Sequence, residues 1–127
     1  MRIPFVDLKA QYHSIKVEID TTIQDVINET AFIKGKYVQK FEKEYADAYG
    51  VKHCISCANG TDAIYITLKA LGVGKGDEVI TVANTWISTS ETITQTGAKP
   101  VFVDIHPDYY TIDVSKIEEK ITSKTKA

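Results

Sequence analysis

Hydrophobic positions in the first fifty residues recur with the spacing of α-helices. Apolar residues from Tyr12 to Val26 follow one another at intervals of three or four, so they share one face of a helix. This pattern predicts a helix over residues 10–29. The same spacing predicts a second helix over residues 36–49, and Gly50 follows it as a C-terminal cap.

Beyond residue 50, short apolar runs of strand length alternate with longer helical segments. The predicted strands cover residues 53–57, 78–82 and 100–103, and the predicted helices cover residues 62–71, 85–96 and 114–121. Such alternation indicates an α/β fold with a parallel sheet and right-handed crossovers. We expect two parts, a helical N-terminal arm over residues 1–50 and an incomplete α/β domain over residues 51–127.

Two of these helices carry unusual sequences. The helix at 62–71 is apolar at most positions, which predicts burial on several sides. The segment from Asn84 to Thr96 contains seven Ser or Thr residues, which favour caps and strands over helix interiors. Asp113 is a candidate N-cap for the helix at 114–121.

Composition and charge exclude several classes of protein. The 127 residues are 43% apolar and 25% charged, with a net charge of −2, so no basic nucleic-acid-binding surface is expected. No apolar run approaches the roughly 20 residues that span a bilayer, and residues 1–7 contain no signal-peptide h-region. Arg2 is the only arginine, so a phosphate site must use backbone amides, hydroxyls or lysines. We expect a cytoplasmic protein without a membrane partner.

The turn at residues 59–62 (NGTD) is the first candidate binding element, because it follows a predicted strand and opens a helix. Ligands bind at the carboxyl ends of parallel strands, and free amides at a helix start suit a phosphate. Gly60 lets the backbone approach a ligand, Thr61 adds a hydroxyl, and the Asp62 carboxylate must point away. The alternatives are an ordinary turn with Thr61 or Asp62 as N-cap, or a hairpin turn.

Trp86 is the second candidate, since it follows the strand at 78–82 and lies at the same sheet edge as Gly60. Its ring could stack on an aromatic ligand. The alternative is a tryptophan in the core or at an interface.

Cys54 and Cys57 form a C-x-x-C pair without a second pair. One pair cannot complete a four-ligand zinc site, and a thioredoxin-like motif requires the helix to begin at the first cysteine. We therefore interpret both as buried structural cysteines, and no metal site is expected.

Taken in order, several segments resemble the DegT/StrS family of nucleotide-sugar aminotransferases. The resemblance is collinear over essentially the whole chain. The segments that carry it are residues 3–8 (IPFVDL), 51–63 (VKHCISCANGTDA), 71–80 (LGVGKGDEVI), 84–89 (NTWIST) and 97–105 (GAKPVFVDI).

The resemblance implies part of the large domain of a fold-type-I, pyridoxal-phosphate-dependent transferase that aminates a nucleotide-linked keto sugar, with an amino donor such as glutamate. It implies that Gly60, Thr61 and Asp62 contact the cofactor phosphate and that Trp86 stacks on the cofactor ring. It also implies a homodimer or higher homo-oligomer.

The resemblance assigns no catalytic residue to this chain. In the family, the Schiff-base lysine and the aspartate that holds the pyridine nitrogen lie beyond the stretch that corresponds to Ala127. We therefore expect the N-terminal third of such an enzyme, itself inactive. The alternatives are a non-catalytic phosphate-, sugar-nucleotide- or partner-binding module, and an enzyme that uses a local lysine such as Lys52 or Lys99.

Overall fold

The computed structural model describes residues 4–127. The chain forms two compact units; the first ends at Ser56 and the second is Cys57–Ala127. The roles that the sequence assigns to residues 1–50 and 51–127 stay predictions.

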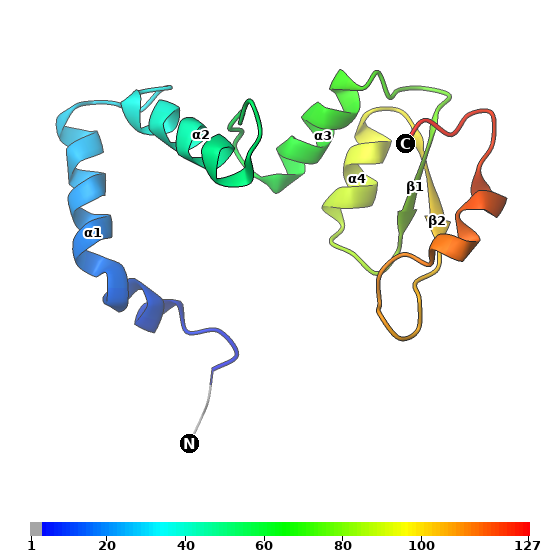
Figure 1. The fold of residues 1–127 in the computed structure, drawn as a ribbon, viewed down its shortest axis with the longest axis horizontal. Coiled ribbons are helices and arrows are strands. Elements are labelled where there is room, and N and C mark those ends of the chain that lie inside the picture. Colours follow the sequence, from blue (N-terminus) through cyan, green and yellow to red (C-terminus); the bar gives the residue numbers. More distant parts are fainter. Residues whose placement is uncertain (1–3) are drawn as a thin grey trace. The chain divides into compact units, whose positions relative to one another are not determined.

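The first unit is built from two helices, α1 (Leu8–Asn28) and α2 (Lys36–Tyr49) (Figure 1). The Asp7 side chain caps α1 by accepting a hydrogen bond from the amide of Ala10 at 2.9 Å. Gly50 ends α2 in the left-handed conformation, with φ of +64°, which glycine adopts without steric penalty. Both helices that the spacing predicts are therefore confirmed.

Few apolar side chains of the first unit are buried. Ala46 is the one buried hydrophobic residue in the described part of this unit. Hydrogen bonds to a side chain of α2 instead fix the last residue of this unit. The Glu42 carboxylate accepts hydrogen bonds from the Ser56 amide at 2.9 Å and from the Ser56 hydroxyl at 2.7 Å.

The second unit alternates helices and strands. Along the chain it contains α3 (Gly60–Ala70), β1 (Glu78–Val82), α4 (Ser88–Gln95) and β2 (Lys99–Val103). The two strands pair in parallel, with Ile80 opposite Val101, and α4 crosses between them and lies against both (Figure 1). The predicted parallel α/β arrangement is confirmed.

The last residues extend the sheet on the other side of β1. The amide of Ile80 donates to the carbonyl of Ala127 at 2.9 Å, and the amide of Lys126 donates to the carbonyl of Glu78 at 2.8 Å. Thr125 thereby forms a parallel bridge with Glu78. These bonds place residues 124–127 beside β1, opposite to β2.

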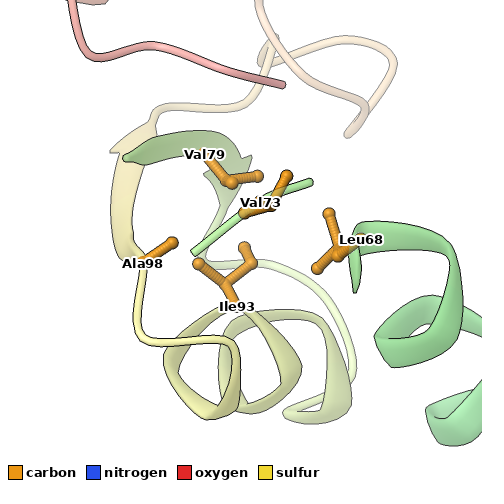
Figure 2. Packing of buried hydrophobic residues seen from close by; sticks show 5 residues of the cluster. All are labelled: Leu68, Val73, Val79, Ile93 and Ala98. Carbon is orange, nitrogen blue, oxygen red and sulfur yellow. The ribbon is translucent and has the colours of Figure 1, made fainter. Parts of the chain in front are cut away.

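A small core joins the elements of the second unit (Figure 2). It is assembled from α3, the turn that follows it, β1, α4 and the residue that precedes β2. Its members are Leu68, Val73, Val79, Ile93 and Ala98. Ile93 of α4 is only 1% exposed and faces Val79 and Ala98 in Figure 2. Burial of such side chains is the main stabilising term in folding.

The predicted strand at residues 53–57 is wrong. Residues 53–57 have no strand conformation, and the backbone amide of Ser56 donates to the Glu42 carboxylate instead of a neighbouring strand. Ile55, which a buried strand would cover, is 84% exposed. A side chain has replaced the backbone partner that a strand requires.

The predicted helix at 114–121 is also wrong. The segment forms two 3₁₀ turns, Val114–Lys116 and Glu118–Lys120, although Asp113 caps the first turn as expected. The segment is short and buries no residue after its cap, so little stabilises a longer helix.

Two other predictions need correction. The helix predicted at 85–96 begins later, at Ser88, because residues 83–87 form the turn that leaves β1. The helix α3, which was expected to be buried on several sides, buries only Leu68, while Ile66 is 54% exposed. No helix among residues 4–127 is long and apolar enough to cross a membrane.

Candidate functional site

A cavity of about 330 Å³ lies at the N-terminal ends of α3 and α4. This volume is in the lower range of small-molecule sites. The residues that line the cavity are Gly60, Thr61, Ile64, Trp86, Ser88 and Thr89. The first three come from α3, and the last three come from the turn after β1 and the first residues of α4.

The first residue of α3 leaves space for a ligand. Gly60 lines the cavity, and a Cβ added at this position would meet no atom within 4 Å. The first amides of a helix lack partners within the helix and carry its positive dipole end. Open space beside such amides can accept an anion.

The Asp62 amide is already bonded. Asn59 is the N-cap of α3, and its side-chain oxygen accepts a hydrogen bond from the Asp62 amide at 2.9 Å. The Asn59 amide group donates in return to the Asp62 carboxylate at 3.2 Å. The cap is therefore Asn59, and neither Thr61 nor Asp62. Asp62 is not among the residues that line the cavity.

Two hydroxyl groups meet where α3 and α4 begin. Thr61 Oγ1 and Ser88 Oγ lie 2.7 Å apart, within hydrogen-bond distance. Ser88 is only 6% exposed. Its carbonyl accepts a hydrogen bond from the Thr92 hydroxyl at 2.8 Å, and Thr92 is fully buried. The pair thus lies on a packed and hydrogen-bonded base.

Trp86 supplies a large, accessible aromatic surface. It lies in the turn between β1 and α4, where its carbonyl accepts from the Thr89 amide at 3.0 Å. The residue is 78% exposed although it lines the cavity. In this chain Trp86 is therefore no core residue, and its ring is free to cover a flat ligand.

The structure brings together three of the four residues that the sequence assigned to the cofactor, namely Gly60, Thr61 and Trp86. Their role as cofactor ligands stays a prediction. Sequence reasoning missed Ile64, Ser88 and Thr89. The signal that could have found the last two is their position directly after Trp86, where hydroxyl residues open a helix.

The side chains that line this cavity favour ligand binding over catalysis. None of its six lining residues carries a titratable side chain, so it offers no acid, base or charged nucleophile. It offers backbone amides, hydroxyl groups and one aromatic face. Such a set can hold an anion and a planar ring.

The two cysteines do not take part in this cavity, and they were interpreted incorrectly. Cys54 is half-buried, Cys57 is exposed, and both are free thiols. The error follows from the missing strand, because residues 53–57 were expected inside a sheet. Among residues 4–127, no three His, Cys, Asp or Glu side chains are grouped to hold a metal ion.

Comparison with curated proteins gives relatives that match nearly the whole chain. The chain is 51% identical over 125 residues to the UDP-2-acetamido-2-deoxy-3-oxo-D-glucuronate aminotransferase of Pseudomonas aeruginosa, covering 98% of this chain and 35% of that protein. It is 48% identical over 127 residues to the Pleiotropic regulatory protein of Geobacillus stearothermophilus, covering 100% of this chain and 34% of that protein. The chain therefore spans about a third of the length of these relatives.

The fold also matches that of a solved structure with a bound cofactor. The crystal structure of NtdA from Bacillus subtilis with bound cofactor PMP superposes with a TM-score of 0.92 and 38% sequence identity. The match covers 98% of this chain and 29% of that protein. This confirms the predicted fold class, part of a fold-type-I transferase domain. Residues 13–127 match the model of the DegT/DnrJ/EryC1/StrS aminotransferase family, and this chain belongs to that family.

Proposed function

We propose that this chain is the N-terminal part of a pyridoxal-phosphate-dependent aminotransferase that acts on a keto sugar carried by a nucleotide. The observation that carries the proposal is the cavity at the starts of α3 and α4, which combines amides, hydroxyls and the Trp86 ring. Supporting it, relatives over nearly the whole chain include an aminotransferase named for a UDP-linked oxo sugar.

The residues present fit the phosphate and ring of this cofactor. The Gly60 and Thr61 amides and the Thr61 hydroxyl would bind the phosphate, where the dipole of α3 favours negative charge. Trp86 would cover one face of the pyridine ring. When bound, the cofactor supplies an electron sink for the carbon from which a proton is removed.

Asp62 can contribute its amide only if Asn59 releases it. In the structure that amide donates to the Asn59 side chain at 2.9 Å, and Asn59 also holds the Asp62 carboxylate. This contact keeps the negative charge of Asp62 fixed beside its own cap. We therefore propose that Asp62 does not contact the phosphate directly and acts through its hydrogen bonds with Asn59.

A single substitution tests the phosphate site. Gly60→Ala places a methyl group in open space, so the fold should remain intact. The methyl group would project beside the amides that bind the anion. We expect titration with pyridoxamine 5'-phosphate, followed by amide NMR shifts, to show at least about tenfold weaker binding in this variant. Equal affinity in the two proteins, with unchanged NMR dispersion, would contradict the proposed site.

The ring contact has its own test. Trp86→Ala should weaken cofactor binding by about 1–3 kcal/mol from lost burial and stacking, and Trp86→Phe should be much milder. Tryptophan fluorescence, quenched by the bound ring in the wild type, and NMR titration of the variants measure this. Unchanged affinity in Trp86→Ala would show that the indole does not contact the ligand.

The fourteen lysines allow a test of whether this chain contains the lysine that bonds covalently to the cofactor. We propose that none of them forms the covalent bond to the cofactor. Borohydride treatment with pyridoxal 5'-phosphate should then leave no single stoichiometric pyridoxyl-lysine in a mass spectrum. One site-specific adduct, for example at Lys52 or Lys99, would overturn this point.

The amino donor, the assembly and the location are parts of the same proposal. We expect an amino acid such as glutamate as donor, and a homodimer or higher oligomer in the cytoplasm. Supporting association, α1 leaves one apolar face largely exposed, with Ile23 at 54%, and exposed apolar surface favours contact with another chain. Sedimentation equilibrium at micromolar concentration tests this, and a single 14.1 kDa species would contradict it.

A second candidate function is non-catalytic. It is favoured by one observation, the 48% identity to a relative named as a regulatory protein. In that case the cavity would bind a phosphate compound or sugar nucleotide without turnover. Transaminase activity in the longer protein that contains this chain would exclude it.

A further inference from the structure

We propose that Ser88 is a positioning residue, which turns the hydroxyl proton of Thr61 toward the phosphate of the ligand in the cavity. The inference rests on the proposed function and adds a residue to it. Ser88 would act through Thr61, and its own hydroxyl would stay buried behind that side chain.

The geometry isolates these two hydroxyl groups as a pair. Thr61 Oγ1 and Ser88 Oγ are 2.7 Å apart, and within residues 4–127 neither hydroxyl has another hydrogen-bond partner. The neighbouring hydroxyls behave differently, since that of Thr92 donates to the carbonyl of Ser88 and that of Thr94 to the carbonyl of Ser90. The Ser88 hydroxyl thus bonds only to Thr61 among residues 4–127, while most hydroxyls of α4 bond back to their own helix.

A hydroxyl group has one proton, so the pair has two possible directions. If Thr61 donates to Ser88, the lone pairs of the Thr61 oxygen face the cavity, and they repel a phosphate. If Ser88 donates to Thr61, the Thr61 proton is free to donate to a phosphate oxygen. A hydrogen bond to a charged acceptor is stronger than a neutral one, so an anion selects the second direction.

Burial gives Ser88 its effect. At 6% exposure, water cannot readily replace Ser88 as the donor to Thr61. Hydrogen bonds in such a chain also polarise one another, so the Ser88 bond strengthens the bond from Thr61 to the anion. Without Ser88, the Thr61 hydroxyl would rotate freely. Fixing its orientation would then reduce the binding free energy of the phosphate.

The test compares ligands with and without the phosphate. For each protein we would measure the ratio of dissociation constants for pyridoxamine and pyridoxamine 5'-phosphate by NMR titration of the 127-residue chain. This ratio isolates the phosphate contribution from the ring contact. The variants are Ser88→Ala, Thr61→Val and the double variant, with Thr94→Ala as control, since it removes an exposed hydroxyl from the same helix.

Ser88→Cys separates hydrogen bonding from packing, because a thiol fills the position of the hydroxyl with a somewhat larger atom and is only a weak donor. We expect Ser88→Ala and Ser88→Cys each to lower the ratio about fivefold or more. Thr61→Val should lower it at least as much, the double variant should lose no more than Thr61→Val alone, and Thr94→Ala should match the wild type.

Three outcomes overturn the inference, and they can be distinguished from one another. If the wild type discriminates between the two ligands and the Ser88 variants keep the same ratio, Ser88 only packs, and the cofactor site itself stands. A double variant that loses the sum of both single effects would show that Ser88 acts independently of Thr61, which also overturns the inference. If the wild type does not discriminate, the cavity is no phosphate site, and the proposed function fails together with the inference.

Discussion

The two units use similar helical sequences in different ways. In the first unit, α1 places isoleucines along one face, yet Ile19 is 38% exposed and Ala46 of α2 is the one buried apolar residue of the described part. In the second unit, Ile93 of the much shorter α4 is 1% exposed. Periodicity therefore determines which segments form helices, whereas burial depends on what the rest of the chain places beside them.

The difference lies in what covers the apolar face. Ile93 faces side chains from β1, from the turn after α3 and from Ala98, just before β2 (Figure 2). Within the described part of the first unit, α1 buries no residue and α2 buries only Ala46. We infer that the second unit carries most of the folding free energy of the chain, and that α1 and α2 depend mainly on their local capping and hydrogen bonds.

The largest expected effect comes from matched isoleucine substitutions. Ile93→Ala should lower the free energy of unfolding by about 2–5 kcal/mol, because it leaves a cavity in the core. Ile19→Ala should cost less than about 1 kcal/mol, since the side chain is partly exposed and replacement by alanine favours the helix. Urea denaturation followed by circular dichroism and by amide NMR signals measures both. Similar losses for the two variants would contradict this division of stability.

The side-chain caps of the two α-helices α1 and α3 give a smaller effect. Asp7 accepts from the Ala10 amide and Asn59 accepts from the Asp62 amide, each at 2.9 Å. Replacing either by alanine should cost about 1 kcal/mol of helix stability. We expect Asn59→Ala to lower the unfolding midpoint of the second unit, because α3 packs on its core.

Asp7→Ala should instead only increase fraying of the first turn of α1. Hydrogen exchange of the amides of residues 8–11 would show it, with little change in the unfolding midpoint. A large shift of that midpoint would mean that α1 is coupled to a core, and the comparison between the units would fail.

The sequence predicted the elements whose signals are local. The bounds of α1 and α2 agree within two residues of the predicted ranges, because apolar spacing and the glycine at residue 50 define them. Local apolar spacing could not decide whether residues 53–57 form a strand, since strand formation requires a partner from elsewhere in the chain. There, the Glu42 side chain bonds the backbone amide of Ser56.

The candidate site shows the same limit. Gly60 and Thr61 follow from a turn that opens a helix, and Trp86 stood out as the only tryptophan. The position of Ser88 after Trp86 could indicate a residue of the cavity, but not its contact with Thr61, which is 27 residues away in the sequence. The Asn59 cap, in contrast, had a local signal that was missed, because an asparagine three residues before an acidic residue at a helix start is typical of an N-cap.

The smallest expected effect is acid-dependent and involves one carboxylate in each unit. Hydrogen bonds from the Ser56 amide and then the Ser56 hydroxyl lower the pKa of Glu42. A hydrogen bond from the Thr122 hydroxyl, followed by the charge of Lys99, lowers the pKa of Glu78. Both carboxylates tie a distant segment to the element that carries them, so both ties should weaken in acid.

The lowered pKa values give the direction of the effect. Each contact stabilises the folded state fully above the ordinary pKa of glutamate, about 4.3. Its contribution is lost as the pH falls through the lower folded-state value. Between pH 6 and pH 3, we expect the Ser56 amide in the first unit and the Thr122 hydroxyl contact in the second unit to be released in the same acidic range, before the core around Ile93 changes.

Amide NMR shifts and exchange rates of Ser56 and Lys124 measure this release, the latter because its amide donates to the Thr122 hydroxyl oxygen. Glu42→Gln should remove the acid-dependent step at Ser56 and leave the step at Lys124, because the two carboxylates hold separate segments. Glu78→Gln should do the opposite. If either variant abolished both steps, the two ties would be coupled through one unfolding event. The contrast between a locally held first unit and a core-based second unit would then be wrong.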